Sequence, residues 1–138
     1  MQSRRAAREA IIGLVYERGF HDPAETPEEI FRLAAEEREI GDDPYITACF
    51  FGICGHLDEI DKKINEYAEG WSTERISAVT LAILRLAVYE LLYAKERLPY
   101  SIAINEAVEL AKAYAEDGAA PFLNGILNTL AKANGCEA

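Results

Sequence analysis

The residues best suited to chemistry are three arginines at the start of the chain, Arg4, Arg5 and Arg8. Side chains three or four positions apart share a helix face, so Arg5 and Arg8 would lie in one row if this segment is helical. The row continues through Ile12 to Tyr16. Guanidinium groups bind phosphate bidentately, and single-stranded RNA is recognised by stacking its bases on aromatic side chains and arginine planes. The row therefore suggests an RNA-binding surface.

These arginines contrast with the rest of the chain, whose formal net charge is -10. The acid nearest to them in the sequence is Glu9. Cations in the first turn of a helix oppose its dipole by about 0.3–1 kcal/mol each, so local helix stability does not explain them. The alternative to RNA binding is a solvated helix end with an Arg5–Glu9 pair, worth about 0.3–0.5 kcal/mol. Because so acidic a chain disfavours nonspecific nucleic-acid binding, an RNA contact should be local.

The composition is that of one globular domain, residues 1–138. Hydrophobic residues make up 50% of the chain and charged residues 28%, so it should fold without a metal or a disulfide. Cys49, Cys54 and Cys136 are an odd number in no recognised metal spacing, and the two histidines have no ligand pattern around them. We therefore expect buried free thiols, no metal and no cofactor.

The longest apolar segment, residues 78–93, is interrupted by Arg85 and Glu90 and falls short of the ~20 residues that cross a bilayer. It is predicted to be a core helix. The N-terminal arginines run directly into an amphipathic stretch, which is not the pattern of a signal peptide. A cytoplasmic protein is expected.

The arginines must be positioned by a first helix, with Ser3 as its N-cap and Gly19 as a left-handed stop. A capping box of Thr26 and Glu29, with Pro27 in the first turn, predicts a second helix that runs to Gly41. The residues of this helix predicted to face inward are Ile30, Leu33 and Ala34.

Asp43 and Pro44 start the clearest helical periodicity in the chain. Apolar residues recur at steps of three and four at Ile46, Cys49, Phe50, Ile53, Leu57, Ile60, Ile64 and Tyr67. Gly52 and Gly55 fall inside this pattern and each costs about 1 kcal/mol relative to alanine. We therefore expect a kink or a close helix contact there, or two helices in place of one, before Gly70.

Ser72 is the predicted cap of the next helix, which from Ala78 onward is apolar nearly all round and should be surrounded by the others. Arg85 and Glu90 inside it would be costly unpaired, so each should meet an opposite charge or backbone groups. Pro99 marks the end of this segment.

Two further amphipathic helices follow, over residues 104–115 before Gly118 and over residues 123–130. A strand pattern is missing throughout the sequence. The predicted fold is an all-α, single-domain helical bundle of six or seven helices.

The sequence contains no Walker loop, dinucleotide fingerprint, nucleophile elbow or zinc-protease motif. The acid pairs Asp42–Asp43 and Asp58–Asp61 are more typical of caps and solvated faces than of general acid–base catalysis. A binding module is therefore favoured over an enzyme.

Several motifs share the order and spacing of one family. They are SRRAAREA at 3–10, IDKKINEYAEGW at 60–71, AILRLAVYELLY at 82–93, INEAVELAK at 104–112 and FLNGILN at 122–128. Together they cover nearly the whole chain, which resembles the bacterial transcription antitermination factors of the NusB family.

The resemblance implies an all-helical, non-enzymatic factor that binds boxA-type single-stranded RNA together with the small-subunit ribosomal protein NusE. Such pairs act on the transcription elongation complex and promote read-through in ribosomal RNA operons. By similarity, the RNA-contacting residues would be Arg4, Arg5, Arg8, Tyr16, Tyr67 and Phe122. Packing in the core is the alternative role of Tyr67 and Phe122.

The chain also departs from the family pattern. Ala6 and Ala7 interrupt the basic run, and Pro121 stands where a basic residue is common, so RNA binding without NusE should be weak. Thr80 replaces an acidic residue on the helix that faces NusE, and Leu81 replaces a basic or polar one. We expect altered polar contacts at this partner-protein interface.

Asn105 and Glu106 lie within a recognisable motif, but the favoured role of this pair is structural, in satisfying amides and charges such as Arg85. Asn124 and Gly125 are interpreted in the same way, as allowing close packing near the start of the last helix.

Two other functions remain open. One is a protein-interaction scaffold or homodimer that keeps the fold with weak or lost RNA binding. The other is the RNA-guiding domain that precedes some ribosomal RNA methyltransferases, which is disfavoured because no catalytic domain follows before Ala138.

Overall fold

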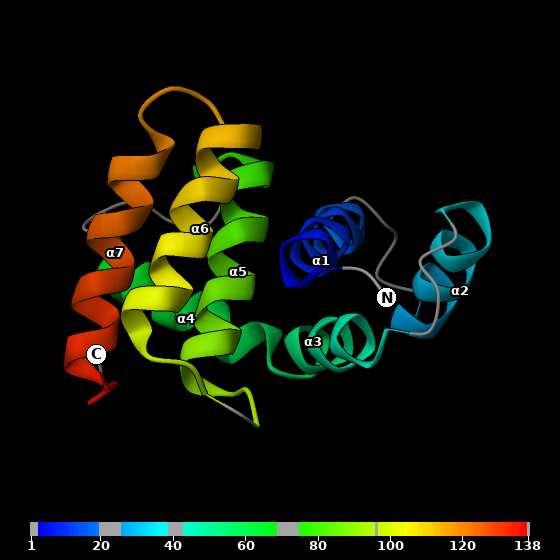
Figure 1. The fold of residues 1–138 in the computed structure, drawn as a ribbon, viewed down its shortest axis with the longest axis horizontal. Helices are drawn as coiled ribbons and strands as arrows, with labels where there is room; N and C mark the ends of the chain where they lie inside the picture. The colour runs from blue at the N-terminus through cyan, green and yellow to red at the C-terminus, as the bar shows by residue number, and fades with distance from the viewer. Residues whose placement is uncertain (1–2, 20–25, 39–42, 69–74, 96, 138) are drawn as a thin grey trace.

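In a computed structural model of the chain, the described residues are 3–19, 26–38, 43–68, 75–95 and 97–137. They form helices without a strand, which confirms the all-α prediction (Figure 1). The helices are α1 Arg4–Arg18, α2 Pro27–Arg38, α3 Pro44–Gly55, α4 Leu57–Tyr67, α5 Ala78–Leu92, α6 Tyr100–Tyr114 and α7 Ala119–Ala133.

Helix α5 is the centre of the packing, as its nearly uniform apolar sequence predicts. It contacts α1, α3, α4, α6 and α7. In Figure 1 helices α5, α6 and α7 stand side by side, whereas α1, α2 and α3 lie on the other side of α5. In this view helix α1 lies between α5 and α2.

The predicted helix starts are largely confirmed. The Oγ of Ser3 accepts a hydrogen bond from the backbone N–H of Ala6 at 3.1 Å, and Asp43 accepts one from Tyr45 at 2.9 Å. Thr26 accepts one from Glu29 at 3.2 Å, as in a capping box. Polar side chains thus satisfy amides at the start of these helices.

Three predicted boundaries differ from the structure. Gly19 has φ −67°, so α1 does not end in a left-handed residue. Helix α5 is capped by Ser77, whereas Ser72 lies outside the described residues. Pro99 precedes α6 as its N-cap residue, seven positions after the last residue of α5, Leu92. The glycines with positive φ among the described residues are Gly118, with φ 89°, directly before α7, and Gly135, with φ 70°.

The long periodic segment is divided into α3 and α4 at His56, as the two glycines suggested. Gly52 is the site of close contact, because a Cβ added there would overlap the ring of Tyr89 on α5. Gly55 has open space around it. Helix crowding therefore requires glycine at only one of these positions.

Some predicted inward positions are wrong. Leu33 is 44% exposed, although its neighbours Ile30 and Ala34 are buried. Gly125 has nothing within 4 Å of an added Cβ, so it does not allow close packing.

The three thiols are free. Cys49 is buried, and burial raises the pKa of its thiol to about 12. Cys54 and Cys136 are partly buried, and burial raises their pKa as well. All three are therefore protonated at neutral pH.

Candidate nucleic-acid interface

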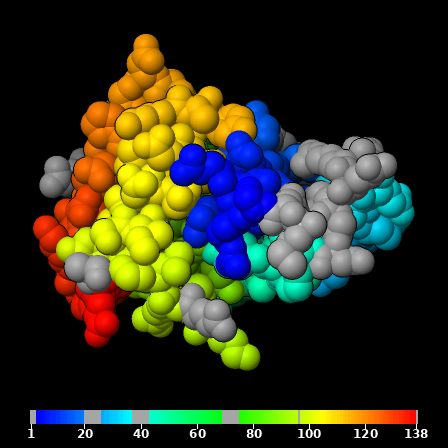
Figure 2. Space-filling view, viewed as in Figure 1, coloured from blue at the N-terminus to red at the C-terminus, as the bar shows by residue number. Residues whose placement is uncertain are grey.

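The predicted row of arginines is divided between the surface and the interior. The side chain of Arg5 is 53% exposed, whereas that of Arg8 is 4% exposed. Ile12 is buried and Tyr16 is 40% exposed. The row therefore does not form one continuous basic face. Figure 2 shows the start of α1 on the molecular surface, next to α6.

Arg8 reaches into the protein and pairs with Glu90 on α5. Its Nη2 lies 2.9 Å from Glu90 Oε2, and its Nε donates to the same oxygen at 3.1 Å. Burial lowers the pKa of Arg8, but the hydrogen bond and charge of Glu90 outweigh it and leave the pKa raised. Arg8 is thus charged, and the pair is shielded from water. An interior position does not support the predicted role of Arg8 as a direct RNA contact.

Tyr45, in the first turn of α3, completes this buried cluster. Its hydroxyl donates to the carboxylate of Glu90. Burial, followed by the negative charge of Glu90, raises the pKa of the phenol well above its ordinary value. Tyr45 therefore remains a hydrogen-bond donor at every physiological pH. Helices α1, α3 and α5 meet at this one carboxylate.

Arg4 and Arg5 are the surface members of the basic cluster. The guanidinium carbon of Arg4 lies 3.7 Å from the centroid of the Tyr45 ring, a cation–π contact. Arg5 donates to Glu106 on α6 at 3.0 and 3.1 Å rather than to Glu9. Glu106 therefore has the structural role predicted for it, but its partners are Arg5 and, at 3.9 Å, Arg8. Arg85 pairs instead with Asp61 at 2.8 Å.

Sequence reasoning missed two aromatic side chains near this surface. Tyr45 was overlooked because its partners lie on other helices. Tyr114 at the end of α6 is 51% exposed, and its hydroxyl donates to Glu9 of α1. Its position beside the apolar stripe that ends at Ala115 was a usable signal that its ring faces outward.

Tyr67 and Phe122 lie away from α1. Both are half-buried and pack against the hydrophobic core. Tyr67 ends α4 and Phe122 lies near the start of α7, helices that Figure 1 shows beyond α5 and α6 as seen from α1. The structure thus does not join them to the arginine cluster.

Thr80, predicted to face a partner protein, is 1% exposed. Its hydroxyl donates to Glu116 at 3.1 Å, and Ser77 donates to the same carboxylate at 2.9 Å. A hydrogen bond within Glu116 itself, together with these two donors, lowers the pKa of its carboxyl group. The surface charge beside Thr80 is therefore that of Glu116, and Leu81 is half-buried.

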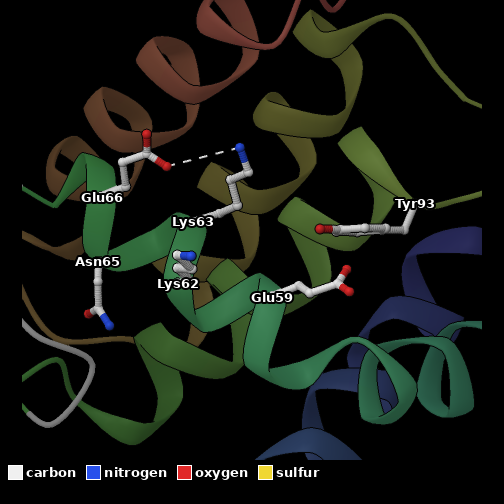
Figure 3. Close-up of a pocket in the computed structure, with 6 residues that line it drawn as sticks. All are labelled: Glu59, Lys62, Lys63, Asn65, Glu66 and Tyr93. Atoms are coloured by element: carbon white, nitrogen blue, oxygen red, sulfur yellow. Dashed lines mark ion pairs between the residues drawn. The ribbon is translucent and has the colours of Figure 1, made fainter.

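An open pocket of about 710 Å³ lies along α4, and Tyr93 from the end of α5 contributes to it (Figure 3). Lys62 and Lys63 line it, but so do Glu59 and Glu66, so its lining carries no net positive charge. Lys63 lies 4.0 Å from Glu66. The pocket is thus a poor phosphate site.

Within the described ranges, no group of three or more histidine, cysteine, aspartate or glutamate side chains could hold a metal ion. No described helix is both long enough and apolar enough to cross a membrane.

Comparison with known proteins agrees with this architecture. The model of the NusB family matches residues 1–132. The transcription antitermination protein NusB of Nitratiruptor sp. is 42% identical over 137 residues, which cover 96% of this chain and 94% of the relative. The Bacillus subtilis protein of the same name is 36% identical over 127 residues, or 92% and 93% of the two chains.

Solved structures give the same result. NusB of T. maritima has a TM-score of 0.80 at 36% identity, covering 95% of this chain and 92% of that one. A crystal structure of the antitermination factors NusB and NusE in complex with dsRNA has a TM-score of 0.81 at 30% identity, covering 94% and 96%. Because the sequence and the fold both match over nearly their whole length, the chain belongs to the NusB family.

Proposed function

We propose that this chain is a non-enzymatic transcription antitermination factor that acts in the cytoplasm as a single domain. It binds boxA-type single-stranded RNA together with the small-subunit ribosomal protein NusE and promotes read-through in ribosomal RNA operons. The names of its relatives, and the complex of a related NusB with NusE and RNA, support this function.

The observation that carries the proposal is the exposed pair Arg4 and Arg5 at the start of α1, in a chain of net charge -10. The guanidinium of Arg4 lies over the Tyr45 ring at the surface, where a phosphate could reach it. Two arginines neutralise few phosphates, so affinity for RNA alone should be low. A second RNA-binding surface, from the partner protein, would raise it by joining two contacts in one complex.

We infer that the partner protein binds at the start of α5, around Thr80 and Leu81. Because Thr80 is buried beneath Glu116, the carboxylate of Glu116 would provide the polar contact there. Glu116→Gln should therefore weaken NusE binding and leave RNA binding in the absence of NusE unchanged.

The test is a titration of labelled boxA RNA at two salt concentrations, with and without NusE. The variant is Arg4→Ala/Arg5→Ala, and Arg32→Ala, an exposed arginine on α2, is the matched control. We expect NusE to tighten RNA binding and the double variant to lose affinity, with a salt slope smaller by about 0.7 for each lost phosphate contact. RNA affinity that is the same for wild type and the double variant would favour a protein-interaction scaffold instead.

A further inference from the structure

Arg4 rests on an aromatic ring whose position is fixed from two sides. The ring of Tyr45 lies 3.7 Å below the guanidinium carbon of Arg4. The backbone N–H of Tyr45 is held by the cap residue Asp43 at 2.9 Å, and its hydroxyl donates to Glu90. The Tyr45 ring beneath Arg4 is thus attached to the start of α3 and to the last turn of α5.

The same carboxylate also binds Arg8. Glu90 is 5% exposed and accepts hydrogen bonds from both Arg8 and Tyr45. If the Tyr45 ring turned away, a buried charged group would lose one of its donors, which is unfavourable in a low-dielectric interior. The buried cluster therefore favours one ring orientation.

We propose that Tyr45 is a positioning residue for RNA binding: it holds the guanidinium of Arg4 at the surface, while Glu90 and Arg8 fix Tyr45 from the interior. The inference rests on the proposed function. Ordering a long side chain before binding reduces the entropy lost when the RNA arrives. Arg8 accordingly acts through the Tyr45 ring and does not touch the RNA.

A double-mutant cycle tests the coupling between Tyr45 and Arg4. The variants are Tyr45→Leu, which removes the ring, Tyr45→Phe, which keeps it, Arg4→Ala, and Tyr45→Leu combined with Arg4→Ala. Each is titrated with labelled boxA RNA in the presence of NusE, after thermal melting shows it folded at the assay temperature. Tyr45→Leu should lower the affinity about two- to fivefold, the range of an exposed cation–π contact.

The double-mutant cycle distinguishes a role of Tyr45 in positioning Arg4 from a general contribution of Tyr45 to the structure. Tyr45→Phe should bind RNA with an affinity between those of wild type and Tyr45→Leu. In the Arg4→Ala background, Tyr45→Leu should have no further effect, because the group that it positions is already missing. An equal loss in both backgrounds, or wild-type affinity of Tyr45→Leu, would overturn the inference.

A second measurement uses the unsubstituted protein and does not depend on the folding of a variant. In ¹⁵N NMR spectra of the arginine Nε groups, RNA should shift the signals of Arg4 and Arg5 and leave that of Arg8 nearly unchanged. An Arg8 shift as large as that of Arg4 would overturn the interior role. Failure of the wild-type protein to bind RNA, with and without NusE, would overturn the proposed function as well.

Discussion

Helix α1 carries two close arginine–glutamate pairs of similar geometry in opposite environments, and Arg8 Nη1 also lies 3.9 Å from Glu106 Oε2. Arg5 and Glu106 are 53% and 21% exposed at a distance of 3.0 Å, whereas Arg8 and Glu90 are 4% and 5% exposed at 2.9 Å. Water and salt can reach the first pair, so a phosphate can replace its carboxylate. The second pair cannot open without leaving charges in the interior. The same residue type, three positions apart, is thus solvent-exposed in one pair and buried in the other.

The largest expected effect comes from breaking the buried pair. Arg8→Ala leaves the buried carboxyl group of Glu90 without its cationic partner, so the free energy of unfolding should fall by about 3–5 kcal/mol. Arg5→Ala should lower it by about 0–1 kcal/mol, because its pair is exposed. Urea unfolding of both variants at neutral pH measures the difference.

Removing both charges of the buried pair sharpens this test. Arg8→Met/Glu90→Met replaces the ions with apolar side chains, and such exchanges are often neutral or stabilising. We expect the double variant to be more stable than Arg8→Ala. If Arg8→Ala lowers the free energy of unfolding no more than Arg5→Ala, burial of the Arg8–Glu90 pair does not determine its contribution to stability.

The contrast between Arg5 and Arg8 also shows what the sequence could and could not predict. Local signals in the sequence were sufficient to predict the N-cap at Ser3, the helical periodicity and the need of Glu90 for a partner. The partners themselves are distant, since Glu90 and Glu106 lie 82 and 101 positions from their arginines. Which face of α1 is buried depends on where α5 and α6 pack, and spacing within one helix does not contain that information.

The same limit applies to the rest of the candidate site. Tyr16, predicted to contact RNA, is 40% exposed. Thr80, which was predicted from resemblance alone to lie at the partner-protein interface, is buried and donates to Glu116. The role of Tyr45 depends on contacts with α1 and α5 that its neighbours in the sequence do not reveal. Leu33 fitted the helical periodicity of α2 and is nevertheless exposed. The periodicity predicts which side of a helix is buried, but it does not predict how wide the buried strip is.

Gly52 and Gly55 are a second case of one residue type in a crowded and in an open environment. Gly52→Ala would push a methyl group into the Tyr89 ring, a type of overpacking that costs about 1–3 kcal/mol, partly offset by about 1 kcal/mol of helix propensity. Gly55→Ala meets open space and should be neutral or stabilising by up to about 1 kcal/mol. Thermal or urea unfolding compares the two variants.

The Tyr89 ring provides the control for this prediction. In a Tyr89→Ala background the overlap is absent, so Gly52→Ala should become stabilising. If Gly52→Ala destabilises the protein equally in both backgrounds, the ring is not the reason for glycine at this position.

Glu106→Gln should have a smaller effect, and on RNA rather than on stability. It removes the carboxylate that competes with RNA phosphate for Arg5, so RNA affinity should rise by up to about fivefold, the value of an exposed ion pair. Glu109→Gln makes the same change of charge on α6, where Glu109 pairs with Lys112 at 3.6 Å. Titration with boxA RNA compares the two variants, and an equal gain from both would indicate a general effect of net charge.

The smallest expected effect concerns Glu116, the exposed partner of buried Thr80. The pKa of Glu116 is lowered by a hydrogen bond to its own backbone and by donors on Ser77 and Thr80. A carboxyl group with a lowered folded-state pKa stabilises the protein above its unfolded pKa, and this contribution is lost as the pH falls through the folded value. Thr80→Val removes one donor, so the pKa of Glu116 should rise and the loss of stability on acidification should shrink. Carboxyl ¹³C NMR titration measures the pKa, and Thr129→Val, on the exposed side of α7, is the matched control. An unchanged pKa in Thr80→Val would mean that the backbone of Glu116 and the donor on Ser77, and not the buried threonine, lower the pKa of Glu116.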